Sequence, residues 1–254
     1  ESMKKDIKLF NVLIKGLFLF IIFNFLFAAW QPRLGKISAY NLIFPGRERL
    51  PFGENSAQAY NLSLFDLDAM FASHVIHGKE KADDEFRVIL IGDSSVWGIL
   101  LTPEETFAGR LNAANLSACG KNVLAYNLGY PTISLTKDVM LLSYGMQYDP
   151  DLILWMTTLE AFPIEKQTAS PLVANNEETL HRLASRYGLE IEANDPDLIQ
   201  KSFWKNTIIG DRRALADLIR LQLYGVMWAA TGIDQVYPTD YVRAQTDLEA
   251  DQSF

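Results

Sequence analysis

A serine directly after an apolar strand is the best-placed chemical group in this chain. Residues 87–95, RVILIGDSS, form an apolar, β-branched run that ends in Gly-Asp-Ser, which is typical of a buried parallel strand feeding a tight turn. The Ser94 hydroxyl is then exposed at the sheet edge, where backbone N–H groups at the start of the next helix can stabilise an oxyanion. Hydrolases that use a nucleophilic serine share this geometry, although GxSxG itself is absent.

A glycine ends the neighbouring strand, at residues 122–129. Without a side chain, Gly129 lets its backbone N–H approach the same point as the serine. The alternative for both residues is structural, because strand–helix junctions often contain a capping serine and a turn glycine. On these two residues alone, the structural alternative is slightly favoured.

Alternating strands and helices position these groups. Thr102, Pro103 and Glu105 form the start of a helix that we expect to run to about Ser117. A second helix is expected over residues 135–148 and a third strand over residues 151–158. This order predicts an α/β fold whose parallel sheet is covered on both faces. The carboxyl ends of such strands gather functional groups, here Ser94, Gly129 and Thr157–Glu160.

Four blocks in order and spacing resemble the SGNH (GDSL-type) hydrolase family: VILIGDSSVWG, LTPEETFAGRL, NLGYPTISLTKDVMLL and YDPDLILW. The resemblance covers about residues 87–160. It implies a three-layer α/β/α sandwich with a parallel sheet and serine-dependent ester hydrolysis or acyl transfer. It also implies that Ser94 is the nucleophile, that the N–H groups of Ser94 and Gly129 form the oxyanion hole, and that Asp93 supports the turn.

Two family blocks are altered or missing. The asparagine of GxND, an oxyanion donor, is replaced in MTTLEAF, where Thr157 or Thr158 could donate instead. No DxxH block follows Ser94, and we do not expect His181 to be the base, because Glu178 stands three residues before it on a solvated helix. Either the protein is a non-catalytic relative, or DxxH and further strands lie beyond residue 254. We favour the second and therefore expect an incomplete sheet.

An apolar stretch at residues 9–30 is long enough to cross a bilayer. The cations Lys4, Lys5 and Lys8 precede it, so the positive-inside rule places residues 1–8 in the cytoplasm and the rest outside, in the periplasm or extracellular space. We therefore expect a single-pass membrane protein with a transmembrane anchor. The alternatives are a cleaved signal peptide and a buried core helix. Signal peptidase requires small residues one and three positions before the cleavage site, and the end of this stretch does not provide such a pair.

Composition excludes several classes of function. The net charge of −8 argues against nucleic-acid binding, and the single cysteine (Cys119) excludes an internal disulfide framework. With three histidines, we expect no metal or other cofactor, and we interpret the neighbouring pair His74 and His77 as structural. A phosphate-binding role for GDSS is disfavoured, since no glycine-rich loop with a lysine accompanies it.

The remaining segments divide into a connector and a helical part. Residues 31–85 are interpreted as an irregular connector, residues 86–160 as the α/β core, and residues 161–254 as a helical insertion and C-terminal segment. The helix expected over residues 212–232 either packs on the sheet or closes a pocket, or else lies along the membrane surface.

These observations favour a membrane-anchored, extracytoplasmic SGNH-type esterase or O-acyltransferase. The resemblance suggests acyl esters of cell-envelope glycans as substrates. The alternative is an inactive accessory or scaffolding subunit of a membrane complex. The expected partners are the lipid bilayer through residues 9–30, an acyl-ester substrate and, for the alternative, membrane proteins.

Overall fold

The structure, a computed structural model, describes residues 9–37, 43–44, 46–52, 61–189, 196, 198–199, 202–238 and 240. The helices, 3₁₀ helices (η) and strands run in the order α1 (Leu9–Trp30), η1 (Leu34–Lys36), η2 (Leu62–Leu64), α3 (Leu67–Ala72), β1 (Glu85–Ile91), α4 (Ser94–Trp97), η3 (Pro103–Glu105), α5 (Phe107–Ala113), β2 (Ser117–Ala118), β3 (Lys121–Asn127), α6 (Leu135–Gly145), η4 (Met146–Tyr148), β4 (Leu152–Trp155), η5 (Leu159–Ala161), η6 (Ile164–Lys166), α7 (Pro171–Asn175), α8 (Glu177–Tyr187) and α9 (Arg212–Thr231).

The sheet has four strands in the order β2-β3-β1-β4. β1 pairs in parallel with β3 and β4, and Ile89 lies opposite both Tyr126 and Ile153. The predicted α/β class is therefore confirmed, with the apolar run of β1 at the centre. The two-residue strand β2, antiparallel to β3, was not anticipated, because the preceding helix was expected to continue through Ser117.

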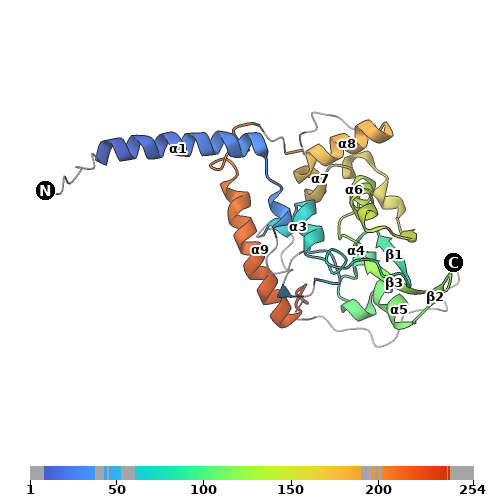
Figure 1. Cartoon of the computed structure of the whole chain (residues 1–254). Coiled ribbons are helices and arrows are strands. Elements are labelled where there is room, and N and C mark those ends of the chain that lie inside the picture. The colour runs from blue at the N-terminus through green and yellow to red at the C-terminus, as the bar shows by residue number, and fades with distance from the viewer. Residues whose placement is uncertain are drawn as a thin grey trace.

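Both faces of β1 are covered by helices (Figure 1). Val88 and Leu90 pack with Ala108 of α5 on one face. On the other face, Ile89 and Ile91 belong to a second apolar cluster that also contains side chains of α3, α6, α7 and α8. The alternation of strand side chains thus places one apolar cluster on each side of the sheet.

Residues 31–85, interpreted as a connector, also contribute side chains to the core in the described part of that segment. Met70 and Phe71 of α3 are fully buried, and Leu50 and Ile76 belong to the same core cluster. Asp66 caps α3 by accepting a hydrogen bond from the Ala69 N–H at 2.9 Å. This segment is therefore an integral part of the domain core.

Local sequence signals predict the capping residues of the helices better than they predict the helix lengths. The capping box of Thr102 and Glu105 is present, but it begins the 3₁₀ helix η3, and Thr106 then caps α5. α5 ends at Ala113, short of the predicted Ser117, and Asn115 just beyond it has a positive φ of 49°. The predicted stop at Gly188 is confirmed, since this residue adopts the left-handed conformation that glycine favours.

α1 extends away from the domain, and α9 runs crosswise to it along the same side of the molecule (Figure 1). The apolar stretch predicted at residues 9–30 forms one helix with the same bounds, long and apolar enough to cross a membrane. α9 was expected to pack on the sheet or to close a pocket, and the structure agrees with the second of these: Arg213, Ala214 and Asp217 line a cavity, and the helix does not pack on the sheet. Its buried Leu221 packs instead with Leu62 and Ala69 of the connector.

Candidate functional site

The carboxyl ends of three strands meet at the Gly-Asp-Ser turn. Beyond β3, the Leu128 N–H donates to Leu90 O at 2.9 Å and the Tyr130 N–H to Gly92 O at 3.0 Å. Beyond β4, the Met156 N–H donates to Ile91 O at 2.9 Å. The turn after β1 is therefore held between the loops that follow its two neighbours, as expected for parallel strands.

Ser94 is the first residue of the single-turn helix α4 and is half-buried. Its hydroxyl forms no hydrogen bond with any residue that the structure describes. The neighbouring Ser95 is engaged, because Asp93 Oδ1 accepts from its N–H at 2.9 Å and from its hydroxyl at 2.8 Å. Asp93 thus supports the turn through Ser95 and leaves the Ser94 hydroxyl without a partner among the described residues.

Gly129 lies directly against α4. A Cβ at this position would be 2.6 Å from Trp97 N and 2.9 Å from Val96 Cβ, so only glycine fits without displacing backbone. Its N–H donates to Asn127 Oδ1 at 3.0 Å, while Asn127 Nδ2 donates to Val96 O at 2.8 Å. The close approach expected for Gly129 is present, but the amide expected to hold an oxyanion is occupied by Asn127.

Thr157 and Thr158 follow β4 and are exposed. The Thr157 hydroxyl is 3.5 Å from Thr158 O, and within the described chain neither threonine side chain is hydrogen-bonded to the Ser94 turn. His181 Nε2 is 3.3 Å from Glu177 Oε1 on α8 and lines a cavity of about 1470 Å³ to which residues 92–98 do not contribute. No base is therefore seen beside Ser94 among the described residues.

A buried lysine on α6 holds the Gly-Asp-Ser turn through backbone carbonyl groups. Lys137 Nζ on α6 donates to Gly92 O at 2.8 Å and to Tyr130 O at 3.1 Å. It also lies 2.5 Å from Asp138 Oδ1, whose other oxygen accepts from Trp155 Nε1 at 3.1 Å. Burial lowers the pKa of Lys137 and raises that of Asp138, although each charge opposes the shift of the other.

A buried arginine fixes α4 from the other end. Arg49 donates to Gly98 O at 2.8 Å and to Leu101 O at 2.9 Å, and its guanidinium lies 4.2 Å from the centre of the Trp97 ring. Its Nε donates to Asp234 Oδ2 at 2.7 Å, beyond α9. Sequence reasoning missed Arg49, Asn127, Lys137 and Asp138.

The two neighbouring histidines contact different groups. His74 is fully buried: Nδ1 accepts from the Ile76 N–H, and Nε2 lies 3.1 Å from both Glu48 O and Asn127 O. His77 Nδ1 contacts the Tyr148 hydroxyl at 3.2 Å. Within the described residues, no group of three His, Cys, Asp or Glu side chains is arranged to hold a metal.

His74 predicts a pH dependence of stability. Burial lowers its pKa from 6.5 to about 4, so the folded state holds it neutral. Between these values the unfolded chain takes up the proton first, and we expect up to about 3 kcal/mol of unfolding free energy to be lost as the pH falls from 6.5 to 4.

Urea titrations at several pH values, on the wild type and on His74→Gln, test this expectation. Whatever the stability of the variant at neutral pH, its unfolding free energy should depend less steeply on pH than that of the wild type, by the contribution of His74. Equal slopes in the two proteins would contradict the assignment.

No protein-family model matches the chain, and comparisons with curated proteins and with solved structures give no significant match either.

Proposed function

We propose that this protein is a membrane-anchored, extracytoplasmic SGNH-type domain in which Ser94 is the nucleophile of an ester hydrolase or acyltransferase. The observation that carries the proposal is the Ser94 hydroxyl, which lies at the carboxyl end of the central strand and is unbonded among the described residues, while that of Ser95 is bound by Asp93. A serine that serves only as a cap would use its hydroxyl on the backbone.

Two further features support the SGNH-type assignment. Helices cover both faces of β1, as in a three-layer α/β/α sandwich. β4 is the last strand on its side within the described chain, and its Leu152 and Trp155 are 44% and 41% exposed. That edge is where the further strands of an SGNH-type sheet would pair.

The proposed reaction begins with attack of Ser94 Oγ on an ester carbonyl. The alcohol leaves and an acyl-serine forms, which water or an acceptor hydroxyl then resolves. The Ser94 N–H is available for the oxyanion, whereas the Gly129 N–H becomes available only if Asn127 Oδ1 releases it. A base from outside the described residues must take the serine proton, because an unassisted serine is a poor nucleophile at neutral pH. Acyl esters of cell-envelope glycans are the proposed substrates.

Anchoring through α1 is part of the same proposal. The protruding part of the helix is mostly apolar, with Lys15 as its one charged residue, and Lys4, Lys5 and Lys8 precede it in the sequence. This charge pattern favours a cytoplasmic N-terminus and a domain outside the cytoplasm.

The alternative is a catalytically inactive accessory or scaffolding subunit of a membrane complex. The engagement of the Gly129 amide by Asn127 favours it, because a hole with one donor fewer loses roughly 10²–10³ in turnover. The same structure would then serve as a platform for a partner.

Fluorophosphonate labelling of the full chain separates the two functions. Labelling of the wild type and of Ser95→Ala, with no labelling of Ser94→Ala, is expected for the enzyme. Ser95 is the matched control, since it lies next to Ser94 in α4 but its hydroxyl is bound to Asp93. A wild type that stays unlabelled where an active serine hydrolase is labelled would overturn the proposal and favour the scaffold.

A further inference from the structure

The outward face of α9 is an apolar stripe. Its large side chains recur at helical spacing, each between 47% and 65% exposed: Ile219, Leu223, Val226 and Met227. The opposite face packs on the connector through Leu221. On that face Asp217 is fully buried, and Arg220 Nη1 donates to its Oδ1 at 2.6 Å. α9 is thus an amphipathic helix whose apolar stripe is uncovered within the described part of the chain.

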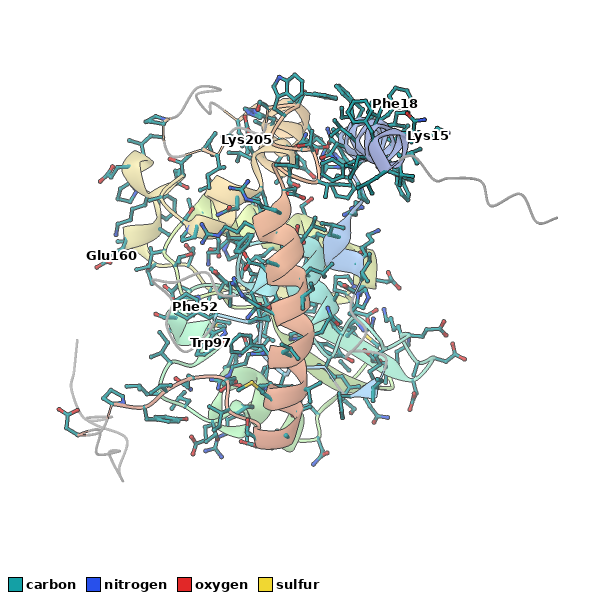
Figure 2. All side chains as sticks on the ribbon, turned by 90° about the vertical axis from the view of Figure 1, so that its left-hand side faces the viewer. Lys15, Phe18, Phe52, Trp97, Glu160 and Lys205 are labelled. Carbon is teal, nitrogen blue, oxygen red and sulfur yellow. The ribbon has the colours of Figure 1, made fainter. Side chains whose placement is uncertain are left out.

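α9 lies on the side of the domain toward which α1 extends. Figure 2 views the molecule from the side toward which α1 points, so that α1 is seen nearly end-on and α9 lies in front of the domain. α1 is fixed in this position by the Ile209 N–H, which donates to Asn24 Oδ1 at 3.2 Å, and by ring contacts of Phe25 with Phe203 and Trp204 at 5.8 and 5.9 Å.

The length of α1 outside the domain is short for a bilayer. Every residue from Leu9 to Ile21 is exposed, and this part extends about 20 Å at 1.5 Å per residue, against a hydrocarbon core of about 30 Å. To span the rest of the hydrocarbon core, the part of α1 that contacts the domain must also lie within the bilayer. Side chains beside that part are apolar and exposed as well: Phe203, Trp204 and Ile209.

We infer that α9 lies in the membrane interface, with its apolar stripe against the lipid acyl chains and its axis along the bilayer surface. The inference rests on the proposed anchoring by α1. A bilayer crossed by α1 contacts the stripe and the aromatic pair Phe203 and Trp204 together, which is how interfacial helices and aromatic belts are placed. Arg212, Arg213 and Arg220 on the same helix give it a basic character that suits anionic headgroups, although the chain as a whole is acidic.

This placement also accounts for Asn24, a polar residue within the apolar run. Its amide oxygen accepts from Ile209, and its Nδ2 donates to Phe20 O at 2.8 Å. Both groups are satisfied where the helix meets the domain, so the asparagine couples the anchor to the segment that leads into α9.

Quenching by nitroxide-labelled lipids tests the inference on the full chain in liposomes of phosphatidylcholine and phosphatidylglycerol. An environment-sensitive thiol fluorophore is attached at Leu223→Cys or at Ile14→Cys, each in a Cys119→Ser background, and at native Cys119 as the control. Cys119 is exposed and belongs to the β2–β3 hairpin, on the opposite side of the domain from α9 (Figure 1). We expect a blue shift and strong lipid quenching at positions 14 and 223, and neither at 119.

The three probes test the membrane anchor and the placement of α9 separately. Quenching at 14 with a residue-223 probe that behaves like Cys119 overturns the interfacial placement and leaves the anchor intact. A blue shift at 223 without lipid quenching means that a second copy or another protein covers the stripe, which also overturns it. A probe at 14 that is not quenched removes the anchor itself and, with it, the basis of the inference.

Discussion

Replacing Arg49 with leucine is expected to lower the free energy of unfolding by about 3–5 kcal/mol. The arginine side chain is 1% exposed, and its partner Asp234 is 14% exposed. The substitution leaves that carboxylate without its counter-charge and removes the donors that reach Gly98 O and Leu101 O. An uncompensated buried charge costs far more than a lost surface contact.

Urea unfolding of the full chain in detergent micelles measures this effect. Arg110→Leu, on the exposed side of α5, is the matched control and should change stability by no more than about 0.5 kcal/mol. Hydrogen exchange should also accelerate at residues 98–101, which Arg49 holds. If Arg49→Leu lowers the free energy of unfolding no more than the control does, the contacts of Arg49 do not contribute to stability.

Elements with a strong local pattern could be predicted from the sequence. α1 is a continuous apolar run, the core of β1 is a β-branched run, and Gly188 ends α8 because a left-handed residue is needed there. In each case the deciding interaction lies within a few residues along the chain. The bounds were less predictable, and α5 is shorter than expected because Asn115 leaves the helical conformation.

The connector could not be predicted in the same way. Arg49 is hydrogen-bonded to Asp234, 185 residues away, so no pattern in the sequence near either residue predicts the contact. Several described residues between 31 and 85 are buried because distant elements pack against them, and Phe71, for example, stacks on Tyr144 with ring centres 4.3 Å apart. Hydrophobic periodicity carries no information about such long-range packing.

The candidate site was predictable in outline only. The position of Ser94 and the support from Asp93 follow from the strand-turn-helix pattern. That Asn127 takes the Gly129 amide depends on the direction of one side chain, which sequence patterns do not fix. The burial of Lys137 could have been found, since it precedes Met140 and Leu141 by three and four residues and therefore shares their buried helix face.

Lys137→Met is the second substitution with a large expected effect, again about 3–5 kcal/mol of unfolding free energy. Methionine fills a similar volume but leaves Asp138 buried without its counter-charge and removes the donor from Tyr130 O. Because Lys137 also holds Gly92 O, the turn that carries Ser94 should loosen. If Ser94 is the proposed nucleophile, its fluorophosphonate labelling should fall together with stability.

The double variant Lys137→Met/Asp138→Asn distinguishes loss of charge balance from loss of the turn contact. Asparagine carries no charge and can still accept from Trp155 Nε1, so the double variant should recover most of the lost stability. The contact with Gly92 O remains absent in both variants, so recovery of stability without recovery of Ser94 labelling would assign the lysine a separate role in positioning the turn. A single variant that loses less than about 1 kcal/mol would instead show that Asp138 is protonated or solvated in the folded protein, because only an uncompensated charge carries the larger cost.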